Sequence, residues 1–229
     1  MKRFKAFTLA EVLITLAIIG VVAALTIPSV ITKYQKRQTV VKLKTAYNIL
    51  QQALIQSEIE NGPHENWNYN LSSAVFFEKY IKKYINYTKY STLSSDNFTG
   101  VDYYMKPYNA STKIPSSSNH PINSNGYPKA ILNNGMIFAA GAEPGPQKCS
   151  VAVDINGVKK PNAYARDVFY LCIHKNHKSL TPFCVLPYSR SSIINHQNYG
   201  CSKTSNFGGQ LCAGLIVIDG WQIKDDYPW

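Results

Sequence analysis

A single acidic residue inside an apolar N-terminal segment constrains this chain more than any other feature. Residues 7–27 read FTLAEVLITLAIIGVVAALTI, follow the basic sequence MKRFKA, and contain Glu11 as their one charged residue. A helix of about 21 residues is about 31 Å long and can span a hydrocarbon core of roughly 30 Å. Because a carboxylate is costly inside such a span, we expect Glu11 to have a positively charged partner.

The leader, the small Ala6 and the sequence FTLAE before an apolar helix resemble the class III signal of type IV pilins and type II secretion pseudopilins. This resemblance implies that a prepilin peptidase cuts between Ala6 and Phe7 and that the new amine of Phe7 is methylated. It also implies that Glu11 neutralises the terminal amine of a neighbouring subunit during assembly. The family usually has glycine where this chain has Ala6, so we expect slower cleavage. Pro28 matches a proline that often kinks or melts the family's helix.

Two simpler interpretations compete with the prepilin-like signal. An ordinary secretory signal would use a small-x-small cleavage site, of which residues 22–24 offer a poor version. A permanent membrane anchor would need only the length of the apolar segment. Neither interpretation accounts for Glu11, so the prepilin-like signal is favoured.

The charges that flank the apolar segment do not set its orientation. Basic residues lie on both sides, and those at positions 33–44 outnumber those of the leader. The five cysteines all lie in the C-terminal part, which favours an oxidising exterior for that part, as the family resemblance does. We therefore expect a single pass through a bacterial inner membrane, with a cytoplasmic N-terminus and an extracytoplasmic head.

The helical pattern continues beyond the apolar segment. Five apolar residues spaced by three and four positions predict one buried helical stripe: Val40, Leu43, Tyr47, Leu50 and Leu54. Gly62 and Pro63 then end the helix. The expected organisation is a leader at residues 1–6, a hydrophobic helix with an amphipathic stem at residues 7–61, and a globular head at residues 62–229.

Short apolar stretches and turn residues predict an antiparallel sheet in the head. Residues 130–132 and 136–138 flank a strong turn signal, Asn133-Asn134-Gly135, and residues 150–153 are expected to pair with residues 168–173. A second hairpin is predicted from residues 215–218 and 221–223 around Asp219-Gly220. Residues 71–87 are predicted as helix and residues 91–128 mostly as loop. The fold class is therefore α+β, a long N-terminal helix packed on an antiparallel sheet, as in pilins.

Residues 151–173 and 214–229 also resemble a widespread group of bacterial prepilin-type proteins whose biochemical role is mostly unassigned.

The cysteines predict disulfides but do not fix all pairings. Cys201 and Cys212 enclose a short Gly-rich loop and are the first expected pair, which would stabilise the fold by roughly 2–4 kcal/mol. Cys172 can pair with either Cys149 or Cys184, and one of the three is left over. Zinc is an alternative for Cys172 and Cys184 with the two intervening histidines, His174 and His177, but their spacing fits no common closed zinc motif.

Three polar residues invite a calcium hypothesis that the sequence does not favour. Asp154, Asn156 and Asp167 offer hard oxygen ligands. However, an EF-hand loop that begins at Asp154 would need glutamate where Ala165 stands. A hydrogen-bonded turn is the preferred interpretation, and we expect neither a metal nor another cofactor.

Catalytic motifs are missing from the sequence, and three isolated histidines, His64, His120 and His196, stand in polar contexts that predict surface positions. We therefore expect no enzyme but a prepilin-like structural subunit of a pilus or type II secretion pseudopilus. Its expected partners are the prepilin peptidase, other pilin or pseudopilin subunits and inner-membrane lipid.

The basic surface leaves two alternatives open. With 24 basic and 13 acidic residues, the chain would attract DNA, and the Lys- and Tyr-rich residues 79–90 are the candidate patch. One alternative is therefore a DNA-binding minor pilin of an uptake apparatus. The other is a permanently anchored extracellular protein.

Overall fold

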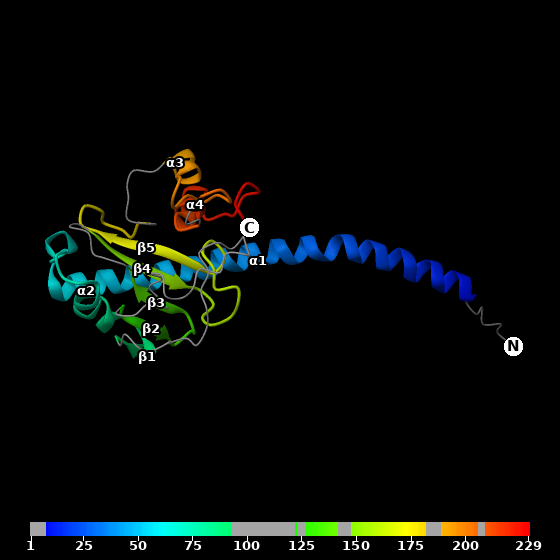
Figure 1. Ribbon diagram of the computed structural model, residues 1–229. Helices are drawn as coiled ribbons and strands as arrows, with labels where there is room; N and C mark the ends of the chain where they lie inside the picture. Colours follow the sequence, from blue (N-terminus) through cyan, green and yellow to red (C-terminus); the bar gives the residue numbers. More distant parts are fainter. Residues whose placement is uncertain (1–7, 93–121, 123–126, 142–147, 182–188, 206–208) are drawn as a thin grey trace. The chain divides into compact units, whose positions relative to one another are not determined.

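The computed structural model describes residues 8–92, 122, 127–141, 148–181, 189–205 and 209–229 (Figure 1). The chain divides into two compact units, Met1–Gln38 and Thr39–Trp229. Helix α1, Leu9–Asn61, contributes to both units and continues through Pro28 without a break. The predicted long N-terminal helix is therefore confirmed.

In the second unit, α1 forms one wall of the main hydrophobic core. Leu43, Leu50 and Leu54 are buried, and Val40 and Tyr47 pack against the same core at its edge. The stripe predicted from their spacing is thus the face that the helix buries. Ala46 and Ala53 complete this face, and their small side chains allow the helix to approach the sheet closely.

A five-stranded antiparallel sheet follows the helix and confirms the α+β class. Its strands are β1 (Tyr87–Ser91), β2 (Lys129–Leu132), β3 (Ile137–Ala140), β4 (Lys148–Asp154) and β5 (Val168–His174), in the order β1-β2-β3-β4-β5. Strand residues alternate between two cores, as the two-residue period of a strand requires. Phe169 and Leu171 join the core that contains α1, whereas Val168 and Tyr170 join a second core on the opposite face.

Both predicted central hairpins are present. Strands β2 and β3 pair with Ala130 opposite Phe138, and Gly135 in their turn has φ +83°, a backbone conformation that favours glycine. Strands β4 and β5 pair from Lys148 opposite His174 to Asp154 opposite Val168.

The helix predicted for residues 71–87 is shorter in the structure. Helix α2 spans Ser73–Tyr80 and is capped by Ser72, whose side chain accepts a hydrogen bond from the amide of Val75. A 3₁₀ turn, Lys82–Tyr84, follows, and β1 begins at Tyr87. Another 3₁₀ turn, His64–Asn66, lies between α1 and α2. Most of the loop predicted for residues 91–128 lies outside the described residues.

The hairpin predicted around Asp219 and Gly220 is wrong. The apolar run before it forms helix α4, Cys212–Ile218, and follows helix α3, Arg190–Asn195. The amide of Gly220 bonds the carbonyl of Val217, the amide of Trp221 bonds that of Ile216, and Gly220 has φ +74°. This bonding is a Schellman cap, in which glycine after the helix serves the same backbone need as in a hairpin turn. A short apolar run ended by Asp-Gly therefore does not distinguish strand from helix.

Candidate functional site

Glu11 lies in the first turn of α1, where it closes a capping box with Thr8. The backbone amide and the hydroxyl of Thr8 both donate to Oε2 of Glu11 at 2.8 Å, and the amide of Glu11 donates to Oγ1 of Thr8 at 3.3 Å. These bonds satisfy amides that the first helical turn leaves without partners. Ala6 and Phe7, between which cleavage is expected, lie outside the described residues.

Sequence reasoning missed this local role of Glu11. The charge of Glu11 predicted a positively charged partner, although Thr8-Leu9-Ala10-Glu11 also fits the pattern of Ser or Thr followed three residues later by an acid. The carboxylate consequently has hydrogen-bond partners within its own chain. A role in pairing between subunits must then compete with the cap or act together with it.

The first unit exposes an unusually apolar helix surface. Leu9 is 77 % exposed and Leu25 75 % exposed, and other large aliphatic side chains between them are exposed as well. Helix α1 has the length and apolar composition needed to cross a membrane. A surface of this kind marks contact with lipid or with other apolar helices.

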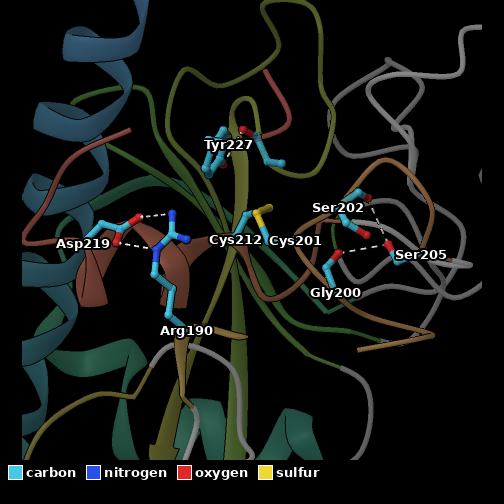
Figure 2. Close-up of a disulfide and its surroundings, with 9 residues drawn as sticks. Arg190, Gly200, Cys201, Ser202, Ser205, Cys212, Asp219 and Tyr227 are labelled. Atoms are coloured by element: carbon cyan, nitrogen blue, oxygen red, sulfur yellow. Dashed lines mark hydrogen bonds and ion pairs between the residues drawn. A yellow bond between two sulfur atoms is a disulfide. The ribbon is translucent and has the colours of Figure 1, made fainter. Parts of the chain in front are cut away.

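The C-terminal part of the head is closed by a disulfide between Cys201 and Cys212 (Figure 2). Their Cα atoms are 4.8 Å apart, and Cys212 is the first residue of α4. Main-chain bonds hold the intervening loop from both ends: the amide of Gly209 donates to Gly200, and that of Leu211 donates to Tyr199. The disulfide thus fixes α4 against the loop that precedes it.

Of the other described cysteines, one is a free thiol and one is disulfide-bonded. Cys149 is a buried free thiol, and Cys172 is disulfide-bonded. The proposed pairing of these two is wrong, because β4 and β5 pair Cys149 with Ile173 and Ser150 with Cys172, so the two sulfurs point to opposite faces. Burial raises the pKa of the Cys149 thiol to about 12. Cys184, the remaining candidate, lies outside the described residues.

The disulfide at Cys172 also removes the zinc alternative, since a bonded sulfur is not a thiolate ligand. His174 and His177 do lie near each other, with ring centroids 5.0 Å apart. Among the described residues, no group of three or more His, Cys, Asp or Glu side chains is arranged to hold a metal ion.

An ion-pair network connects α3, α4 and the C-terminal segment. Figure 2 shows its central pair, Arg190 and Asp219. Arg190 donates two hydrogen bonds to the carboxylate of Asp219, at 2.8 and 3.1 Å, and a third to Asp226 at 2.7 Å. Lys224 also bonds Asp219, at 2.6 Å. Hydrogen bonds from Arg190, followed by those from Lys224, hold the pKa of Asp219 below its usual range. A buried carboxylate at the end of α4 therefore connects three separate segments.

Hydrogen bonds to Asp167 organise the turn after β4. Its carboxylate accepts the backbone amides of Asn162 and Ala163, at 2.8 and 2.6 Å, and the side-chain amide of Asn156 at 3.2 Å. Asp154 caps the same turn by accepting the amide of Asn156. This arrangement is the hydrogen-bonded turn that the sequence favoured over calcium. Burial outweighs these hydrogen bonds and raises the pKa of Asp167 to about 6.

The predicted surface position of His64 is wrong, because the residue is 2 % exposed. Its Nδ1 contacts Oε1 of Glu58 at 2.5 Å, and its Nε2 lies 2.7 Å from the carbonyl of His177. The polar sequence around His64 concealed a partner more than a hundred residues away. His196 is half-buried, and its Nδ1 accepts the amides of Asn198 and Tyr199; His120 lies outside the described residues.

The basic residues at 79–90 interleave with aromatic rings, as the sequence predicted. Lys82 lies over the ring of Tyr90 at 4.0 Å, and Lys79 lies over that of Tyr80 at 5.0 Å. However, Lys82 also pairs with Glu78, and Lys83 pairs with Glu60. Part of the positive charge in this segment is thus already neutralised.

Two family models match the chain, and together they cover every residue except Pro28. A family of unknown function (DUF6613) matches residues 29–229, and the prokaryotic N-terminal methylation motif matches residues 1–27. No curated protein and no solved structure matches the chain. The methylation motif confirms the type IV pilin-like signal that the sequence predicted.

Proposed function

Because the chain belongs to the family of unknown function DUF6613 and carries a prokaryotic N-terminal methylation motif, we propose that it is a structural subunit of a pilus or pseudopilus. The prepilin peptidase would remove residues 1–6, and Phe7 would become the methylated N-terminus. The observation that carries this proposal is the joining of the motif to a long helix whose apolar side chains are exposed.

The proposed assembly uses the two parts of α1 differently. Before assembly, the apolar part anchors the subunit in the inner membrane in a single pass, where lipid covers its side chains. During assembly, these helices leave the lipid and bundle with those of neighbouring subunits. The part of α1 beyond Thr39 stays in the head, because its buried face belongs to the head's own core.

Glu11 has two roles in this proposal. Within its own chain it caps α1 through Thr8. Between chains, its carboxylate neutralises the terminal amine of Phe7 on the adjacent subunit, which removes an unpaired charge from an apolar environment. Such pairing would align each new subunit with the growing end of the filament.

An extracytoplasmic head is supported by its cysteine chemistry. The bond between Cys201 and Cys212, together with the bonded Cys172, fits an oxidising compartment, because disulfides rarely persist in a reducing cytosol. This location agrees with a cytoplasmic leader and a subunit that assembles outward.

Intact-mass measurement and N-terminal sequencing of protein recovered from its native membrane test the proposal. The expected product begins at methylated Phe7, and an Ala6→Gly variant should reach this product faster than the natural chain. A chain that keeps Met1 in the presence of an active prepilin peptidase would contradict the proposal and favour a permanent anchor.

DNA binding by a minor subunit is the second candidate function. The contacts of Lys79 and Lys82 with tyrosine rings favour it, because cations and aromatic rings together suit nucleic acid. The ion pairs with Glu78 and Glu60 reduce the charge available for phosphates. Retention on duplex DNA that falls steeply with salt, and falls further in Lys79→Ala, would support this role. Salt-insensitive or absent retention would exclude it.

A further inference from the structure

A groove rich in side-chain amides lies beside α1 in the head. Its volume is about 520 Å³, within the size range of small-molecule sites. Six of its twelve lining residues are asparagine or glutamine. They are Asn48, Gln52, Gln56, Asn86, Asn133 and Asn134.

Regular secondary structure positions the amides on both sides of the groove. Asn48, Gln52 and Gln56 are four residues apart on α1, so they lie on one face of the helix. The opposite wall includes the turn between β2 and β3, where the amide of Asn133 donates to the carbonyl of Asn86 at 3.2 Å. The two walls are therefore held in place by a helix and a sheet.

All six amides are solvent-exposed, and most of them are unpaired among the described residues. In the part of the chain that the structure describes, the side-chain amides of Asn48, Gln52, Gln56, Asn86 and Asn133 make no hydrogen bond. Asn134 differs, because its Oδ1 accepts the amide of Met136 at 3.1 Å. Each unpaired carboxamide offers both donors and an acceptor to a ligand.

The other six lining residues are three aliphatic residues, one tyrosine, Thr45 and Lys83. Ile85 and Leu132 are 4 % and 3 % exposed, and the half-buried Tyr84 contributes a ring. The hydroxyl of Tyr84 donates to Glu60 and accepts from Asn61, which fixes the ring. Ile85 and Leu132 thus form the floor of the groove, and the half-buried Ile49 and Tyr84 offer apolar contact beside amides that both donate and accept.

The groove carries little charge in a chain whose formal net charge is +11. Lys83 is the one charged residue among the described lining residues, and it pairs with Glu60. An anionic ligand would lack a free cation there, and a cationic ligand would lack a carboxylate in the lining.

We propose that this groove binds a neutral oligosaccharide. A pyranose ring presents hydroxyl groups that donate and accept, which match carboxamides, and C–H faces that pack on an aromatic ring and aliphatic side chains. The groove offers these two kinds of contact side by side. All twelve lining residues lie in the second unit, beyond the leader and the apolar part of α1.

Ligand-observed NMR on the full-length chain, in lipid nanodiscs without sugar detergents, tests this proposal. The probes are maltotriose, cellotriose and N,N′-diacetylchitobiose, with trigalacturonate as an anionic comparison. At least one neutral probe should receive saturation from the protein, and trigalacturonate should not. Gln52→Ala should weaken this binding about tenfold, the effect of losing one good hydrogen bond.

The matched control is Gln222→Ala, which removes an exposed glutamine outside the groove lining and should leave binding unchanged. Because alanine favours helix, Gln52→Ala should retain the melting temperature of the natural chain. Binding of no neutral probe up to about 10 mM, or equal binding by both variants, would overturn the proposal. Cross-linking of Gln52→Cys chains to each other, without sugar binding, would assign the groove to a second copy instead.

Discussion

At the scale of single residues, Glu11 has two proposed roles that an experiment can separate. Its charge suits pairing with the terminal amine of a neighbouring subunit, whereas the capping box with Thr8 gives it a role within one chain. Both roles need an acceptor at this position, but only pairing with a terminal amine needs a negative charge. A neutral hydrogen-bond acceptor at position 11 therefore separates the capping role from the pairing role.

Glu11→Gln and Glu11→Ala form the test. Glutamine can retain the capping bond but carries no charge, whereas alanine removes both. If pairing between subunits is essential, both variants should enter the membrane, and both should lose nearly all filaments when sheared material is measured by immunoblot. Normal filament yield from Glu11→Gln alone would show that the cap is the essential function.

Ionisation of the buried Asp167 opposes folding. Its pKa is raised from 3.8 to about 6, so the folded chain binds more protons than the unfolded chain between these values. Its contribution to stability is fully present below pH 3.8 and is lost as the pH rises through about 6. The expected loss is on the order of 3 kcal/mol.

Urea unfolding of the natural chain and of Asp167→Asn, at several pH values, measures this contribution. Asparagine cannot accept both amides of Asn162 and Ala163, so the variant should be less stable at every pH. The difference in unfolding free energy between the two proteins should shrink from pH 4 to pH 7. A difference that grows with pH would contradict the assigned direction of the pKa change.

At the scale of elements, local signals predicted what depends on near neighbours. The stripe on α1 and the Asn133-Asn134-Gly135 turn specify their structure within a few residues, and both are present. The hairpin predicted from residues 215–218 and 221–223 is wrong, because Gly220 suits either a hairpin turn or a helix cap. The choice depends on packing of α4 against the sheet and on the bond from Cys212 to Cys201, neither of which is local.

The candidate site likewise divides into features that depend on nearby residues and features that depend on residues far along the chain. The pair Cys201 and Cys212 was predicted from the short loop between them and is bonded in the structure, whereas the assembly role of Glu11 stays a prediction. The partners of His64 and of Arg190 were missed, because they lie far along the chain: the carbonyl of His177 and the carboxylate of Asp219.

The contact between α3 and α4 predicts a specific stability change. Arg190→Ala leaves the buried Asp219 with Lys224 alone, so its pKa should rise and the melting temperature should fall by about 5 °C or more. Asp226→Ala removes the exposed partner of the same arginine and should change the melting temperature by about 2 °C or less. Equal effects in differential scanning calorimetry would show that the buried carboxylate has no special role.

The loss in Arg190→Ala should also depend on pH. A lowered pKa stabilises the fold above the unfolded value and loses that contribution as the pH falls through the folded value. The two proteins should therefore converge in stability under acidic conditions below about pH 4.

At the scale of the whole molecule, the odd number of cysteines gives a distinctive thiol count. Peptide mapping of the oxidised chain should recover the bond between Cys201 and Cys212 and a second bond at Cys172, for which Cys184 is the expected partner. Cys149 should react with an alkylating reagent after denaturation, but not before, because it is buried. Rapid labelling of Cys149 in the folded protein would contradict this assignment.

Cys201→Ser should destabilise the oxidised head by roughly 2–4 kcal/mol in urea unfolding, whereas Cys149→Ala should leave both disulfides intact. Under reducing conditions the natural chain and Cys201→Ser should unfold at similar urea concentrations. An unchanged midpoint for Cys201→Ser under oxidising conditions would argue that the loop is held by its main-chain bonds alone.

Pro28 lies inside a helix that nonetheless continues through it. Proline has no amide hydrogen, so the carbonyl of Ala24 loses its helical hydrogen bond, and this turn resists stretching least. Opening about four residues from 1.5 Å to about 3.3 Å each would lengthen the chain by about 7 Å. A fibre built from such subunits would yield elastically under tension at one repeated point and recoil when released, without breaking the contacts on either side.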